Sequence, residues 1–69
     1  MFEPRVDMRV RCIKQKNPFM CDKYYIINHI TKHQNQAVLI HIYNNNDGTN
    51  WFFHLDDFYN HFISLGSLS

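Results

Sequence analysis

The feature that most restricts the fold of this chain is a series of short apolar stretches, each ended by residues that favour turns. Asn17-Pro18, a wholly polar stretch at 32–36 and Asn46-Asp47-Gly48 divide the sequence in this way. Pro cannot donate to a strand ladder, and Asp-Gly readily supplies the positive φ angles that tight hairpins need. Short segments separated by such turn signals are typical of an all-β fold.

The apolar stretches have the composition and the alternation of strands. In the first of them, Val10 and Cys12 alternate with Arg9 and Arg11, which predicts a half-buried strand. The later stretches are rich in aromatic and β-branched residues, which favour a pleated surface. Five strands are expected, at Met8–Lys14, Lys23–Thr31, Ala37–Tyr43, Trp51–His54 and Tyr59–Ile63.

Five short strands leave open edges and apolar faces, which a sheet hides when it curls and closes. The sequence therefore predicts a small five-stranded antiparallel β-barrel, with residues 55–58 forming a single 3₁₀ turn before the last strand. One alternative stays open, because Phe58, Phe62 and other residues of Asp56–Leu65 fall at helical spacing. If that stretch is helical, the fold becomes a sheet with a C-terminal helix across it.

The length of 69 residues allows one domain and no second core. We expect the core to span residues 7–63 and the tail, residues 64–69, to be frayed. No apolar run approaches the roughly 18 to 20 residues of a membrane helix and no secretion signal is visible, so no membrane partner is expected. Cys12 and Cys21 are too few for a disulfide framework, which favours a cytoplasmic protein with reduced thiols.

The charges are distributed unevenly along the chain. All seven Lys and Arg residues lie before residue 33, whereas residues 33–69 carry three of the six carboxylates and no Lys or Arg. A basic strand with Arg9 and Arg11, followed by Lys14, attracts an anionic partner, either a nucleic acid or an acidic protein face. A solvated strand face without any partner is the other interpretation of the same charges.

The chain has more large aromatic side chains than one small core can bury. Residues expected to fill the core are Tyr25, Ile27, Ile30, Val38, Ile40, Ile42, Phe52 and Phe58. The remaining rings then lie outside, close the barrel ends or cover a dimer interface; they are Tyr24, Tyr43, Trp51, Phe53 and Tyr59. Exposed Trp and Tyr beside Arg or Lys are typical of a binding hot spot, and also of a stacking platform for single-stranded nucleic acid.

No motif indicates catalysis, a metal or a cofactor. His29 and His33 are four residues apart, but on a strand and a loop this spacing does not place them on one face. Asp56-Asp57 beside His54 would need a pocket that separates the pKa values of the carboxyls, and a filled small barrel offers none. We therefore expect a protein that is not an enzyme, with no catalytic residue, no metal ligand and no cofactor.

Several motifs, taken in chain order, are similar to those of a known family. They are Met8–Ile13, Asp22–Ile27, Asn46-Asp47-Gly48, Trp51-Phe52 and Phe58. Over residues 7–60 their order resembles that of the small single-domain SH3-like barrel proteins of bacteriophages and bacteria. Asp22 stands where the family usually has Gly, and Asp57 where it usually has Arg, so no contact of that Arg is carried over. The resemblance implies an SH3-like barrel that binds proteins, peptides or nucleic acids rather than one that catalyses a reaction.

These observations favour a phage-type, non-enzymatic module that binds and modulates a host protein. Its predicted partner-binding residues are Arg9, Arg11, Lys14, Tyr24, Tyr43, Trp51 and Phe53. The alternative is an SH3-like or KOW-like barrel that binds nucleic acid, with the basic strand and Lys16 on phosphates and Trp51 or Tyr24 stacking on bases. A third interpretation is a structural subunit that acts through oligomer edges, for example as a dimer.

Overall fold

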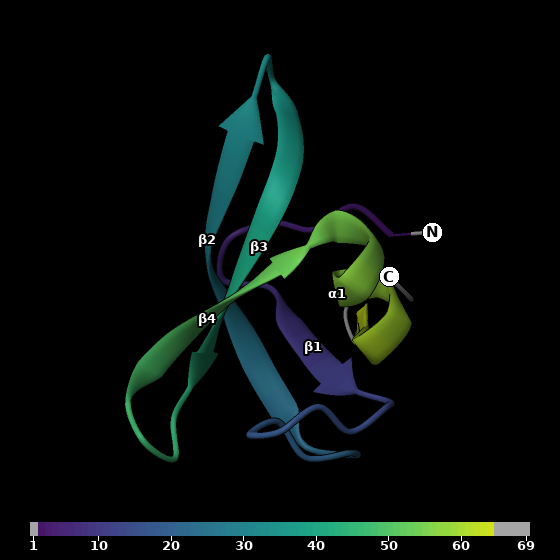
Figure 1. Cartoon of the computed structure of the whole chain (residues 1–69), viewed down its shortest axis with the longest axis vertical. Helices are drawn as coiled ribbons and strands as arrows, with labels where there is room; N and C mark the ends of the chain where they lie inside the picture. Colours follow the sequence, from purple (N-terminus) through teal and green to yellow (C-terminus); the bar gives the residue numbers. More distant parts are fainter. Residues whose placement is uncertain (1, 65–69) are drawn as a thin grey trace.

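Five strands and one helix make up most of residues 2–64, which are the residues described by the structure, a computed structural model (Figure 1). In chain order they are β1 Arg9–Cys12, β2 Tyr24–His33, β3 Gln36–Asn44, β4 Thr49–His54, α1 Leu55–His61 and β5 Phe62–Ser64. Every strand pair is antiparallel, and the strand order is β4-β3-β2-β1-β5. The prediction of an all-β protein with five antiparallel strands is confirmed.

The sheet is open, and the predicted closed barrel is not found within residues 2–64. β4 and β5 stand at opposite ends of the strand order and do not pair with each other. Figure 1 shows β2 and β3 as a long twisted hairpin whose tip extends beyond the rest of the sheet. The inner face is covered instead by α1 and by Phe19 from the loop after β1, so a core forms without closure of the strands.

The turns follow from residues that tolerate a left-handed backbone. Gln34 and Asn35, with φ of 53° and 65°, join β2 to β3 as a two-residue turn, so the predicted five-residue connection is wrong. Residues 45–48 join β3 to β4 as predicted, and Gly48 has φ of 75°. The Gly48 N–H donates to the carbonyl oxygen of Asn44 over 2.8 Å, which closes this turn.

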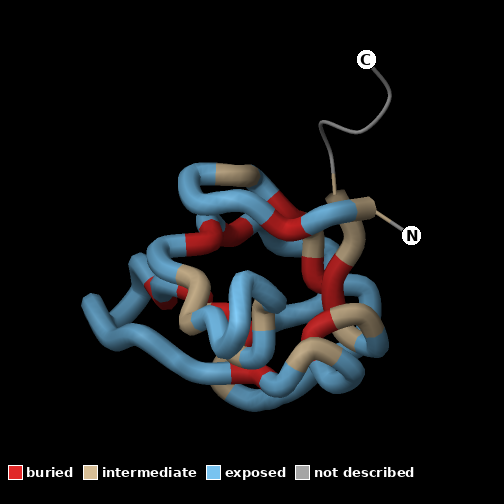
Figure 2. The backbone as a smooth tube through the Cα atoms, turned by 90° about the horizontal axis from the view of Figure 1, so that it is seen from above, coloured by how far each residue is buried: buried red, intermediate tan, exposed pale blue. Residues whose placement is uncertain are grey.

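The core lies between the inner face of the sheet, α1 and the loop that precedes β2. Figure 2 shows buried positions alternating with exposed ones along the chain. The fully or almost fully buried apolar residues are Val10, Cys12, Phe19, Tyr25, Ile27, Ile40, Ile42, Phe53, Phe58 and Phe62. Phe19 meets the rings of Tyr25, Phe53 and Phe62 edge to face, with centroids 4.9–5.7 Å apart. A loop residue therefore completes the aromatic centre of the core.

The inward and outward positions of β4 are the reverse of those predicted. Phe53 is 3% exposed and lies in the core, whereas Phe52, predicted as a core residue, is 64% exposed. The reason is the register with β3, which places Phe53 opposite the buried Ile40 and Phe52 opposite His41. Val38, also predicted in the core, is exposed.

The segment after β4 is an α-helix rather than the predicted single 3₁₀ turn. Phe58 and Phe62 are both buried four residues apart, and the Phe62 N–H donates to the Phe58 carbonyl oxygen at the helix end. Asp56 and Asp57 lie in the first turn, where their negative charges interact favourably with the positive end of the helix dipole and stabilise the helix. The last strand is consequently Phe62–Ser64 and not Tyr59–Ile63. The alternative prediction of a helix over 56–65 is correct only up to His61, where α1 ends.

The N-terminal segment packs against the helix. The ring of Phe2 lies 5.6 Å from that of Phe58 and 5.5 Å from that of Tyr59, measured between centroids. The Tyr59 hydroxyl donates to the Phe2 carbonyl oxygen over 2.8 Å. Phe2 thus packs on the core although it precedes the expected range of 7–63. Of the tail expected to be frayed, Ser64 belongs to β5 and residues 65–69 lie outside the described part.

Candidate binding surface

The face of the sheet that points away from the core carries the side chains between the buried ones. Since side chains alternate along a strand, residues next to the buried Val10, Tyr25, Ile42 and Phe53 point outward. We call this surface the outer face and define it by Arg9, Arg11, Tyr24, Ile26, His29, His41, Tyr43 and Phe52. Unlike the inner face, it is covered neither by α1 nor by the Phe19 loop.

The strand register brings these outward residues into rows across the sheet. Arg9 on β1 is paired with Ile26 on β2, and Ile26 is paired with Tyr43 on β3. Beside that row, Arg11 is paired with Tyr24. Directly opposite residues on neighbouring strands lie within reach of each other, so the two arginines border an apolar strip on the outer face.

The apolar side chains of the outer face are among the most exposed large hydrophobic residues of the described chain. Tyr24 is 54% and Phe52 64% exposed, and Ile26 and Tyr43 are each 39% exposed. Single exposed apolar residues are ordinary on protein surfaces. Neighbouring ones on adjacent strands form an apolar patch, and such patches commonly mark an interaction site. This patch is the strongest candidate for a functional surface within residues 2–64.

The sheet carries no carboxylate. The described strands contain the cations Arg9, Arg11 and Lys32 and four histidines, but none of the six Asp and Glu residues. All six carboxylates lie in the N-terminal segment, the loops and α1: Glu3, Asp7, Asp22, Asp47, Asp56 and Asp57. The outer face is therefore positive at its Arg end, and it attracts negative charge on a partner.

Two histidines meet at the other side of the outer face. The ring centroids of His29 and His41 are 4.9 Å apart, and the ring of His41 lies 4.5 Å from that of Phe52. A hydrogen bond of 2.7 Å joins His41 Nε2 to the hydroxyl of Thr31. Burial lowers the pKa of His41 below its ordinary value, and the neighbouring His29 lowers this pKa further because two imidazolium charges repel each other.

The lowered pKa of His41 predicts a loss of stability in mild acid. Between pH 7 and pH 5 the unfolded chain binds a proton at residue 41 more readily than the folded chain, so the free energy of unfolding falls as the pH decreases through about 6.5. Urea denaturation of the wild type and His41→Gln at pH 8 and pH 5.5 measures this effect. We expect the free energy of unfolding of His41→Gln to fall less between pH 8 and pH 5.5 than that of the wild type. An equal fall in both proteins would contradict the attribution of this effect to His41.

The structure brings some of the predicted site residues together and separates others. Arg9, Arg11, Tyr24 and Tyr43 share the outer face. Lys14 is exposed but lies in the loop after β1, beyond the sheet.

Two predicted site residues of β4 lie on the opposite side of the sheet. Trp51 points toward the inner side, where its ring meets Phe19 at 6.3 Å, and it remains 42% exposed at the rim. Phe53 is buried, so its prediction as an exposed partner-binding residue is wrong.

Four members of this surface were not predicted from the sequence: Ile26, His29, His41 and Phe52. Their positions depend on which residues of neighbouring strands face each other. The alternation within β2 was a usable signal for Ile26, because it follows the inward Tyr25 directly. The pairing of His29 with His41 had no such signal, since an irregularity in the register lies between Ile27 and His29.

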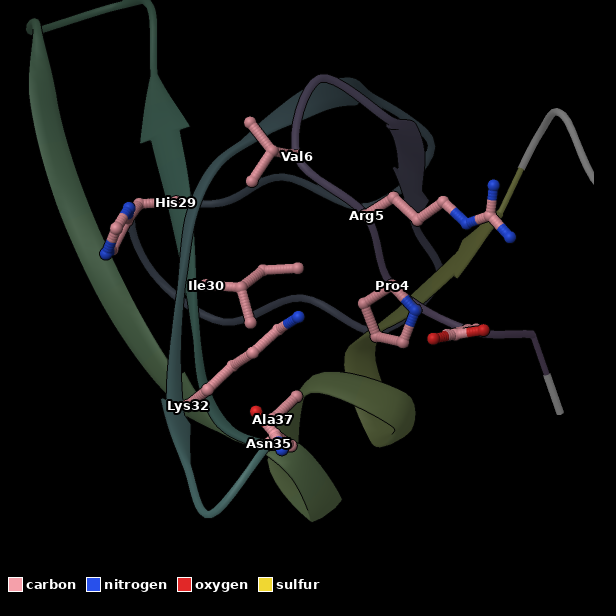
Figure 3. A pocket seen from close by; sticks show the side chains of 9 residues that line it. Pro4, Arg5, Val6, His29, Ile30, Lys32, Asn35 and Ala37 are labelled. Atoms are coloured by element: carbon pink, nitrogen blue, oxygen red, sulfur yellow. The ribbon is translucent and has the colours of Figure 1, made fainter.

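A pocket of about 450 Å³ lies between the N-terminal segment and the β2–β3 hairpin (Figure 3). Its lining residues are Glu3, Pro4, Arg5, Val6, His29, Ile30, Lys32, Asn35 and Ala37. Figure 3 shows Ile30 and Lys32 reaching from β2 toward Pro4 on the opposite wall. Among the described residues, the lining contains no Ser, Thr, Tyr or Cys, so they offer charge and apolar contact but no hydroxyl or thiol nucleophile.

Within residues 2–64 there is no group of three or more His, Cys, Asp or Glu side chains that could hold a metal ion. Both cysteines are free thiols, Cys12 buried and Cys21 exposed. The Cys12 thiol donates to the Lys14 carbonyl oxygen over 3.2 Å, and burial raises its pKa. Cys12 is therefore a core residue.

Comparisons with family models, with curated proteins and with solved structures found no match to this chain. In the described part of the chain, no helix has the length and apolar character needed to cross a membrane. The fold and the surface define a small all-β single-domain protein with an open five-stranded sheet and a carboxylate-free outer face.

Proposed function

We propose that this chain is a non-enzymatic binding module that docks a protein partner on the outer face of its sheet. The observation that carries the proposal is the exposed strip formed by Tyr24, Ile26, Tyr43 and Phe52 on three adjacent strands. Large, rigid rings release much water at a small cost in side-chain entropy, so they dominate the binding energy of many interfaces.

The charges of the outer face select the partner's chemistry. Arg9 and Arg11 border the strip, and no strand supplies a carboxylate to neutralise them. The Nε atom of Arg11 is buried without a hydrogen-bond partner among the described residues, so part of this side chain is held against the sheet. A partner whose contact surface carries Asp or Glu around an apolar centre matches this arrangement, because the arginines can receive its carboxylates in bidentate pairs.

The fold class, the origin of the partner and the cellular location form part of the same proposal. We assign the chain to the SH3-like class, supported by five antiparallel strands, the return of β5 to β1 and a short helical segment before β5. The resemblance to SH3-like proteins of bacteriophages and bacteria adds a host protein as the partner, whose activity the module modulates. Free thiols at Cys12 and Cys21 agree with a reducing compartment, and the cytoplasm is the location proposed.

Removing two rings of the strip is expected to weaken partner binding strongly without unfolding the chain. A tagged wild-type chain, the double variant Tyr24→Ala/Tyr43→Ala and the control Met20→Ala are compared in pull-downs from lysate of the native cells. Met20 is an exposed apolar residue in the loop before β2 and is not part of the strip. Each hot-spot ring contributes about 1–2 kcal/mol, so the double variant loses about 30-fold or more in affinity. Equal recovery of one partner by all three chains, or of none by the wild type, would contradict the proposal.

A nucleic acid is the second candidate partner, favoured by the same rings and arginines. Exposed aromatic side chains on neighbouring strands can stack on unpaired bases while Arg9 and Arg11, with Lys14 and Lys16 nearby in the chain, contact phosphates. Mobility shifts with single-stranded DNA and RNA at two salt concentrations separate the candidates. A complex that weakens steeply with salt favours nucleic acid, and no shift at low salt discards it.

A further inference from the structure

Among residues 2–64, no strand pairs with the outer edge of β4. β4, Thr49–His54, is the first strand in the order β4-β3-β2-β1-β5, and its register runs only with β3. In an antiparallel strand paired on one side, about every second residue directs its N–H and C=O groups toward the unpaired side. Within the described residues, β4 therefore presents a row of backbone donors and acceptors that another strand can use.

This edge lacks the features that usually protect an edge strand. Its sequence, Thr-Asn-Trp-Phe-Phe-His, contains no Lys, Arg, Asp, Glu or Pro, and the β3–β4 pairing shows no irregularity that would twist the edge away. Natural sheets shorten or charge their edges to prevent association, and β4, with six uncharged residues, does neither.

We propose that β4 pairs in antiparallel fashion with β4 of a second copy of this chain, which forms a two-fold symmetric dimer with one continuous sheet. In such a pairing the strand lies against its own copy, so a Lys, Arg, Asp or Glu near the symmetry axis would lie beside the like charge of the other copy. β4 carries none, which makes it compatible with its own copy.

The exposed side chains of β4 favour the same arrangement. Phe52 is the most exposed of the large hydrophobic residues in the described chain, at 64%, and it lies near the middle of β4 on the outer face. Antiparallel pairing of two β4 strands brings a Phe52 from each copy to one surface, where the rings lose water together. A chain of 69 residues has a small core, and small domains commonly gain stability by association.

The dimer shares Phe52 with the proposed partner-binding strip, but it requires only a second copy of this chain and no other protein. Its test therefore uses the purified full chain alone. Sedimentation equilibrium over a wide concentration range is expected to give a mass that rises from one chain to two. Amide hydrogen exchange is expected to slow in residues 49–54 as the concentration rises, since the edge N–H groups gain partners.

Two substitutions by lysine distinguish edge pairing from stacking of the outer faces. Phe52→Lys places a charge on β4 and is expected to weaken the dimer by at least about tenfold. Tyr24→Lys is the matched control, because Tyr24 is also an exposed outer-face ring but lies on β2, away from the edge; its dimer is expected to persist. Circular dichroism confirms that both variants fold.

Three results would overturn the proposal. The first is a mass of one chain at all concentrations up to the millimolar range. The second is a dimer that Tyr24→Lys weakens as much as Phe52→Lys does, since that pattern indicates contact through the outer faces. The third is a dimer in which the amides of residues 49–54 gain no protection, which places the interface elsewhere.

Discussion

Phe53→Ala is expected to lower the free energy of unfolding by about 3–5 kcal/mol, whereas Phe52→Ala, one residue earlier, lowers it by less than about 0.5 kcal/mol. Phe53 is 3% exposed and its ring lies 5.2 Å from that of Phe62 and 5.4 Å from that of Phe19, between centroids. Its removal leaves a cavity among rigid rings. Phe52 loses little on truncation because most of its surface is in water already.

The two alanine variants form a matched pair, since the residue type, the strand and the substitution are the same. Urea denaturation followed by circular dichroism gives both free energies under one set of conditions. A chain of this length has a total stability of about 3–10 kcal/mol, so Phe53→Ala is expected to lose a large share of it. Similar losses for both variants, or a greater loss for Phe52→Ala, would mean that the register of β4 against β3 is not the one described.

Phe19→Ala is expected to have an effect of similar size, about 3–5 kcal/mol, although Phe19 lies in a loop rather than in a strand. Phe19 is fully buried and contacts rings from β2, β4 and β5. Its ring covers apolar surface of the inner face that the strands of a closed barrel would bury. Without it the sheet exposes apolar surface to water, and its strands lose a shared contact.

Met20→Ala is the control for this prediction, because Met20 is the next residue and its side chain is exposed. It is expected to change the free energy of unfolding by less than about 0.5 kcal/mol. Thermal and urea denaturation of the two variants measure the difference. If Phe19→Ala were as stable as Met20→Ala, the loop would be a peripheral segment and the core would be held by the strands and α1 alone.

The strands and turns were predictable because their signals are local. Alternation at Val10 and Cys12 locates β1, and Asn46-Asp47-Gly48 locates the turn after β3. The length of the β2–β3 connection was not predictable in the same way. Polar residues such as Lys32 and Gln36 read as loop in the sequence, yet the left-handed conformation of Gln34-Asn35 allows the ladder to continue to the tip.

The helix and the openness of the sheet depended on contacts distant in sequence. Leu55–His61 is short for an independent helix, so its intrinsic preference is weak. It forms because burying Phe58 against Phe2 and Phe62 repays the cost of ordering it. With α1 and Phe19 covering the inner face, the apolar surface that predicted a closed barrel is already buried.

For the candidate site, the sequence alone determined the ingredients: a basic first strand with Arg9 and Arg11, more aromatic rings than the core can hold, and carboxylates placed outside the strands. Only the tertiary structure decided which rings face water together, because two adjacent phenylalanines such as Phe52 and Phe53 satisfy the same alternation in either orientation. The orientation of the two rings is set by the pairing of β4 with β3. Ile40, which lies opposite Phe53, is buried, and a shift of one residue would turn every side chain of β4 to the other face.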